Sequence, residues 1–104
     1  MLDIYLVSIQ LCRDVRAISE QVGRHDRNLL DQLRRAVTSV PLNLAESDGA
    51  QGGNRRQRRL TALGSAREVG ACLDVAEALG YARVDAGVRS RLDHVIGVLV
   101  KLTR

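Results

Sequence analysis

Four arginines crowd one short segment and are the side chains best suited to bind an anion: Arg55, Arg56, Arg58 and Arg59. They follow a glycine-rich stretch, DGAQGG at residues 48–53, and fall in the first turns of a predicted helix. A helix N-terminus carries a partial positive charge, so cations there are destabilising unless something offsets them. A bound polyanion such as nucleic acid is one offset, because phosphate contacts require only cations. Glu46 and Asp48, an acidic patch on another subunit, and a solvated charge run are the alternatives.

If nucleic acid binds, contact with its backbone is the expected mode. Tyr5 and Tyr81 are the only aromatic residues in the chain, so there is no series of platforms on which bases could stack. The glycine-rich stretch lacks the GxxxxGK[ST] pattern and follows no predicted strand, which argues against a phosphate-cradling loop. The formal net charge of +4 permits a polyanionic partner without identifying one.

Residues capable of acid–base chemistry are few and scattered. His25 lies in a predicted turn and His94 on a predicted helix, and neither has a Cys or Ser at a recognisable catalytic spacing. Glu46, Glu68 and His94 could together hold a metal ion, but carboxylates close to apolar helix faces more often pair with arginines. We therefore expect no enzymatic activity, no cofactor and no metal site.

The two cysteines, Cys12 and Cys72, lie far apart within apolar helical patterns and form no CxxC motif. We expect buried, reduced thiols, with a bridge between helices as the alternative. Asp3 falls where a secretory signal would carry basic residues, and no apolar run is long enough to cross a bilayer. These features predict a cytoplasmic protein.

Apolar residues recur at steps of three and four in segments that predict helices over residues 2–22, 26–47, 55–79 and 85–103. Gly23 and Gly80 are expected to end the first and third helices. Asp26 and Asp85 are expected N-caps, and Asn54 is expected to open a capping box. Helices of similar length with short links predict one domain, residues 1–104, folded as an all-α, antiparallel up-down-up-down four-helix bundle.

Pro41 lies inside the second predicted helix, and the apolar pattern continues unbroken on both sides of it. A proline within a helix removes one backbone hydrogen bond and kinks the helix, so we expect one continuous, kinked helix. The carbonyl of Val37 loses its usual donor. Ser39 or Asn43 is expected to satisfy polar groups around the kink.

More apolar surface is predicted than one bundle needs. The surplus stripes contain candidates for an interface between copies of the chain: Leu2, Leu6, Ile9, Cys72, Val75 and Leu79. Contiguous exposed apolar surface usually marks an interaction site. We expect a homo-oligomer, and a wider core within one chain is the alternative.

Residues 33–46 read LRRAVTSVPLNLAE, and LGSARE (63–68) and LGY (79–81) follow. This run resembles the LRRA-x-x-S-[IV]-P-x-N-[IL]-AE segment of the four-helix bundle proteins encoded within intervening sequences of bacterial large-subunit ribosomal RNA genes. Accessory variability proteins of diversity-generating retroelements are distant relatives. The resemblance implies a ring-like homopentamer, and in the retroelement relatives a basic surface that binds nucleic acid and a reverse transcriptase. Ser47 replaces the family's usual glycine, and the stretch before the third helix lacks the usual aromatic.

The shared motifs mark residues with expected structural or ion-pairing roles: Arg34, Arg35, Ser39, Pro41, Asn43, Glu46, Ser65 and Glu68. Glu46 and Glu68 are expected to face Arg34 or Arg35, within or between subunits. The sequence thus predicts a non-enzymatic homo-oligomeric bundle whose basic surface binds nucleic acid or a ribonucleoprotein partner. The alternative is a purely structural protein-interaction module that binds no nucleic acid.

Overall fold

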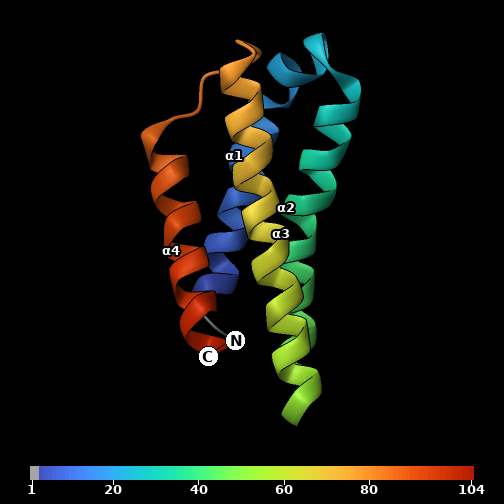
Figure 1. Ribbon diagram of the computed structural model, residues 1–104, viewed down its shortest axis with the longest axis vertical. Coiled ribbons are helices and arrows are strands. Elements are labelled where there is room, and N and C mark those ends of the chain that lie inside the picture. Colours follow the sequence, from blue (N-terminus) through green and yellow to red (C-terminus); the bar gives the residue numbers. More distant parts are fainter. Residues whose placement is uncertain (1–2) are drawn as a thin grey trace.

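The computed structural model describes residues 3–104, and this range contains four helices and no strand. They are α1 (Asp3–His25), α2 (Arg27–Gly49), α3 (Gly52–Ala78) and α4 (Ala86–Leu102). Figure 1 shows the chain passing up α1, down α2, up α3 and down α4, so that the beginning of α1 and the end of α4 lie at the same end of the bundle. Each helix packs against two others in the ring order α1, α2, α3, α4. The predicted all-helical four-helix bundle is confirmed.

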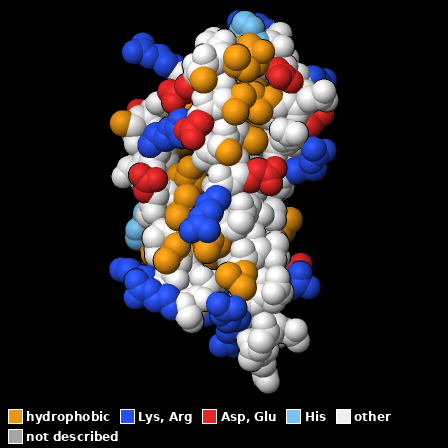
Figure 2. All heavy atoms as spheres, in the orientation of Figure 1, with side chains coloured by type: hydrophobic (Ala, Val, Ile, Leu, Met, Phe, Trp, Pro, Cys, Tyr) orange, Lys and Arg blue, Asp and Glu red, His pale blue; other side chains and the backbone are white. Residues whose placement is uncertain are grey.

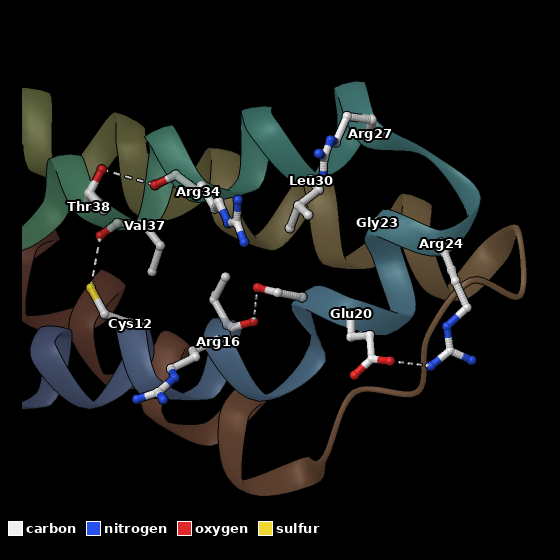
Figure 3. A pocket seen from close by; sticks show the side chains of 12 residues that line it. Cys12, Arg16, Glu20, Gly23, Arg24, Arg27, Leu30, Arg34, Val37 and Thr38 are labelled. Carbon is white, nitrogen blue, oxygen red and sulfur yellow. Dashed lines mark hydrogen bonds and ion pairs between the residues drawn. The ribbon is translucent and has the colours of Figure 1, made fainter.

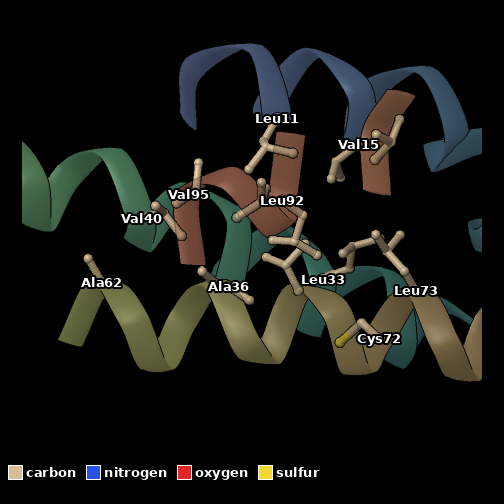
Figure 4. Packing of buried hydrophobic residues seen from close by; sticks show 14 of the residues in the cluster. Leu11, Val15, Leu33, Ala36, Val40, Ala62, Cys72, Leu73, Leu92 and Val95 are labelled. Carbon is tan, nitrogen blue, oxygen red and sulfur yellow. The ribbon is translucent and has the colours of Figure 1, made fainter. Parts of the chain in front are cut away.

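The core is built from aliphatic side chains of all four helices, which meet along the bundle axis (Figure 4). Leu11, Leu33, Leu73 and Leu99 are fully buried, one from each helix. These residues belong to the stripes that the spacing of three and four predicted. Burial of such apolar surface contributes roughly 25 cal/mol per Å² and is the main force holding the helices together.

Two helix ends follow their sequence signals. Asp26 is the N-cap of α2, and its Oδ1 accepts a hydrogen bond from the Leu29 amide at 2.9 Å. Gly80 follows α3 with a φ of +73°, a conformation that glycine adopts without steric cost. The Gly80 and Tyr81 amides donate to the Glu77 and Ala76 carbonyls, which gives the paired bonds of a Schellman stop.

The predicted stop at Gly23 is wrong, because α1 continues to His25. A Cβ atom at Gly23 would lie 2.8 Å from Cδ2 of Leu30. The glycine therefore serves the close approach of α2 to α1 rather than a left-handed turn.

The predicted loop over residues 48–53 and the capping box at Asn54 are also wrong. The link between α2 and α3 is only Ala50 and Gln51, and Gln51 occupies the N-cap position without a side-chain hydrogen bond. The pairing of α2 with α3 is the most extensive in the bundle. Extending both helices to a short link lengthens that packing, which outweighs the low helix propensity of three glycines.

Helix α2 is continuous through Pro41, as the unbroken apolar pattern predicted. The carbonyl of Val37, which Pro41 leaves without its helical donor, lies 3.6 Å from Sγ of Cys12 on α1 and accepts a hydrogen bond from that thiol. Asn43 donates instead to the Ser39 carbonyl, two residues before Pro41, and so satisfies a polar group near the proline, as expected. The kink itself stays a prediction.

Candidate nucleic-acid interface

Three of the four arginines at the start of α3 are engaged within the chain. Arg55 donates from Nε to the Ala50 carbonyl at 3.1 Å. Arg56 donates from Nε and Nη2 to the Thr103 carbonyl at 3.1 and 2.7 Å. Arg58 forms an ion pair with Glu46 on α2, with 2.9 Å between Nη1 and Oε2. These arginines therefore tie the beginning of α3 to the ends of its neighbours.

Arg59 is half-buried, and its Nε is a buried atom with no hydrogen-bond partner. Glu46 neutralises Arg58, so a carboxylate of the same chain offsets part of the positive charge at the start of α3. This is one of the alternatives considered from the sequence. Arg56 contacts the carbonyl of Thr103, the C-cap of α4, and carbonyls at a helix C-terminus carry partial negative charge. The cluster therefore presents fewer free cations than its four arginines suggest.

A second set of arginines surrounds a depression between α1 and α2 with a volume of about 730 Å³ (Figure 3). We call it the arginine groove and define it by Arg16 and Arg24 of α1 and Arg27 and Arg34 of α2. In Figure 3 the side chain of Arg34 points from α2 into the space beside α1. Small residues of α1, Ser19 and Gly23, line the same depression and leave it open.

The arginine groove carries an excess of positive charge. Arg24 pairs with Glu20 at 3.1 Å, and this is an exposed pair one turn apart on α1. Arg16, Arg27 and Arg34 are exposed, and their guanidinium groups make no hydrogen bond or ion pair with any residue in the described range 3–104. The floor is apolar, and its residues Val15, Leu30 and Val37 are already covered, each with 2% of its surface exposed.

The polar residues of the LRRA…AE motif bind α2 to α3. Ser65 of α3 donates to Oγ of Ser39 at 2.7 Å. Asn43 donates from Nδ2 to the carbonyl and hydroxyl oxygens of Ser39 at 2.9 and 3.0 Å. Ser39 and Ser65 thus form a contact between the two helices, and the hydrogen bonds of Asn43 to Ser39 stay within α2.

The expected pairing of Glu46 with Arg34 or Arg35 within one chain is wrong, because Glu46 pairs with Arg58. Arg34 and Glu46 are twelve positions apart on one helix, which separates them by roughly 18 Å along its axis. Glu68 is exposed and forms no ion pair within the range that the structure covers. Pairing of Glu68 with an arginine of another subunit stays a prediction.

Three ion pairs between helices, made by two arginines of α4, had no signal in the sequence. Arg91 of α4 donates from Nε and Nη2 to both carboxylate oxygens of Asp14 on α1, each at 2.8 Å. Arg89 of α4 contacts Asp74 at 2.8 Å and Glu77 at 2.6 Å, both on α3. Hydrogen bonds from Arg89 and from the Val84 amide hold the pKa of Glu77 below its ordinary value. The partners in these ion pairs lie too far apart in the sequence for residue spacing to predict them.

The predicted interface residues fall into three groups. Leu6, Val75 and Leu79 are exposed by 66%, 45% and 57%, and Ile9 is half-buried. Cys72 belongs to the core and is only 6% exposed, so a single chain already covers it and it is not part of an exposed interface. Leu2 lies outside the described residues.

Other apolar residues are exposed as well. Leu42 of α2 is 62% exposed, although the sequence did not single it out. Ala71 and Ala78 are exposed on the same side as Val75 and Leu79, and the four form an apolar stripe that runs along the end of α3 to its C-cap residue, Leu79. Figure 2 shows hydrophobic side chains gathered over the C-terminal half of this helix.

The histidines do not join a catalytic or metal-binding group. His25 stacks on Tyr81 with ring centroids 4.9 Å apart, and His94 is exposed on α4. Within residues 3–104, no three His, Cys, Asp or Glu side chains come close enough together to hold a metal ion. None of the helices in that range has the length and apolarity needed to cross a membrane.

Comparisons with known proteins bear on this architecture. A family model described as 23S rRNA-intervening sequence protein matches residues 1–101. The fold is similar to the crystal structure of a protein of unknown function from the S23 ribosomal protein family of Bacteroides thetaiotaomicron. That similarity has a TM-score of 0.86 at 15% sequence identity and covers 97% of this chain and 98% of the other. No curated protein sequence matches the chain.

Proposed function

Since this chain belongs to the family of 23S rRNA-intervening sequence proteins, we propose that it is a non-enzymatic, cytoplasmic homo-oligomer that presents a basic surface to nucleic acid. The resemblance of the LRRA…AE motif implies that the oligomer is a pentamer. A reverse transcriptase or another ribonucleoprotein is a further partner that the resemblance implies.

The observation that carries the proposal is the uncovered apolar stripe on α3. Val75 and Leu79 remain about half exposed, although the core beneath them is closed. Ala71 and Ala78 lie on the same side of the helix and are small, which lets another helix approach closely. Burying this stripe against a second copy would remove apolar surface from water, and that is the usual driving force for stable association.

The basic character of the chain supports the nucleic-acid part of the proposal. The net charge is +4, and three arginines of the arginine groove have no partner within the range that the structure describes. Free guanidinium groups suit phosphate oxygens, which they can contact in a bidentate manner. Binding of this kind is independent of base sequence and weakens steeply with salt.

Sedimentation velocity of paired variants tests the assembly. Val75→Glu with Leu79→Glu places two charges on the apolar stripe and is expected to convert the oligomer to a monomer. Gln21→Glu, an exposed position on α1, is the control and should leave the sedimentation coefficient unchanged. An unchanged coefficient in the stripe variant would remove the stripe from the interface.

The alternative function is an assembly module that binds no nucleic acid. The ion pairing of Arg58 with Glu46 favours it, because that contact gives part of the basic cluster a structural role. Wild-type protein that shifts no RNA or DNA in a gel at about 50 mM salt, where phosphate contacts are strong, would select this alternative.

A further inference from the structure

We infer that the arginine groove between α1 and α2, rather than the Arg55–Arg59 cluster, binds the phosphate backbone of a single nucleic-acid strand. This inference rests on the proposed function and assigns its nucleic-acid contact to a defined site. The residues that carry it are Arg16, Arg27 and Arg34, with Arg24 at the rim.

The two groups of arginines differ in what already satisfies them. In the Arg55–Arg59 cluster, Arg55 and Arg56 each donate to a backbone carbonyl of the same chain. Arg58 pairs with the carboxylate of Glu46. A phosphate that bound there would have to replace those contacts. In the arginine groove, three guanidinium groups have no protein partner within residues 3–104, so a phosphate would replace only water.

The arginine groove selects for charge more than for apolar surface. Its floor residues Val15, Leu30 and Val37 are each only 2% exposed, so an amphipathic helix docked there would bury little additional apolar area. The charged groups on its walls are the guanidinium groups of four arginines, and only one carboxylate, Glu20, lines the depression. Guanidinium groups match phosphate geometry bidentately. These features favour a phosphodiester chain over an acidic helical peptide.

The dimensions suit a single strand. Arg27 and Arg34 are seven residues apart on α2, which places them about 10 Å apart along the helix. A strand advances about 3.4 Å per nucleotide in its stacked form, so this span covers roughly three phosphates. A flexible strand can turn its backbone into a depression between two helices, whereas a duplex is stiff on this scale.

Fluorescence anisotropy with a labelled oligouridylate tests the assignment, on the full chain. The groove variant is Arg27→Ala with Arg34→Ala. Arg67→Ala with Arg83→Ala is the matched control, because both residues are exposed and lack ion pairs within the described range, and the double change removes the same charge. Arg55→Ala with Arg58→Ala tests the competing site. Circular dichroism establishes that each variant is folded.

The groove variant is expected to bind about tenfold more weakly for each arginine removed. Its slope of log affinity against log salt should be shallower by about 1.4, since each single-strand phosphate contact contributes about 0.7. The control and the cluster variant should retain affinities within about threefold of wild type. A duplex of the same length and a polyglutamate of equal charge should both bind more weakly than the strand.

Wild-type protein that binds no strand overturns the nucleic-acid part of the proposed function, and the groove assignment with it. Binding that survives in the groove variant overturns the assignment alone. Equal losses of affinity in the groove variant and its control would show an effect of net charge alone, and this result also overturns the groove assignment. A preference for duplex or for polyglutamate overturns the choice of a single phosphodiester strand.

Discussion

At the scale of residues, Cys12 and Pro41 form a unit that joins two helices. Pro41 supplies no amide hydrogen to the Val37 carbonyl, and the Cys12 thiol donates to that oxygen from α1. Burial raises the pKa of the Cys12 thiol, and the nearby Arg13 lowers it to a lesser extent. The raised pKa keeps the thiol protonated at neutral pH, and a protonated thiol is required for donation.

A double-mutant cycle tests this unit. Cys12→Ala should cost about 0.5–1.5 kcal/mol in the wild-type background, because the Val37 carbonyl loses its donor. In a Pro41→Ala background the restored amide of residue 41 can bond that carbonyl, so the same change should cost less. The measurement is the free energy of unfolding in urea at fixed protein concentration. Equal costs in both backgrounds would show that the thiol contact contributes nothing.

Glu77 gives a pH-dependent prediction. Its pKa is lowered in the folded protein, mainly by the hydrogen bond from Arg89, so the folded state binds fewer protons than the unfolded state. The stabilisation is fully present above the ordinary carboxyl pKa of about 4.5 and is lost as the pH falls through the lower value of the folded protein. Glu77→Gln should therefore be less stable than wild type at neutral pH, with a gap that narrows in acid.

Urea unfolding across a pH series measures this gap. Asp93→Asn on α4 is the control, because Asp93 is exposed and forms no ion pair in the part of the chain that the structure covers. A gap between wild type and Glu77→Gln that stays constant from neutral pH into acid would mean that the contact with Arg89 is not the source of the stabilisation.

At the scale of elements, the ends of the helices depend on different interactions. Asp26 caps α2 through its side chain, whereas Asp85 occupies the same position before α4 without a side-chain hydrogen bond. Arg91 of α4 and Asp14 of α1 hold those two helices together through a bidentate ion pair, in which the Asp14 side chain is only 9% exposed.

The two N-caps form a matched pair for mutation. Asp26→Ala should destabilise the protein by about 1 kcal/mol, because the Leu29 amide loses its acceptor. In a domain of this size that loss lowers Tm by about 4–8 °C. Asp85→Ala should change stability by less than about 0.5 kcal/mol. Thermal melts of both variants at one concentration measure the difference, and equal shifts in Tm would contradict the capping role of Asp26.

The helices could be predicted from the sequence because their periodicity is local. In α3 the core-facing residues that recur at steps of three and four are all buried: Ala62, Ala66, Val69, Leu73 and Ala76. The end of α1 could not, since the role of Gly23 depends on Leu30 across the helix pair. In the candidate site, too, a local pattern could be predicted and a feature made by packing could not. Four arginines within residues 55–59 are visible in the sequence as a cluster. The arginine groove consists of residues from two helices and forms only when those helices pack together.

At the scale of the whole molecule, a bundle of 42 × 24 × 20 Å closes one aliphatic core and leaves apolar side chains on its surface. Leu6 of α1, Leu42 of α2 and Leu79 at the C-cap of α3 are each more than half exposed. Single exposed leucines are ordinary, but a contiguous stripe such as that on α3 is not. In the proposed function, self-association covers this stripe and the arginine groove binds the nucleic acid.

The measurement that tests this account most directly is the molar mass of the wild-type protein by light scattering during size-exclusion chromatography, over a range of dilutions. We predict a single species several times the 11.4 kDa of one chain, with five copies as the expected number. A mass of one chain at every concentration would contradict the central claim, because the apolar stripe on α3 would then be stable in water without a partner.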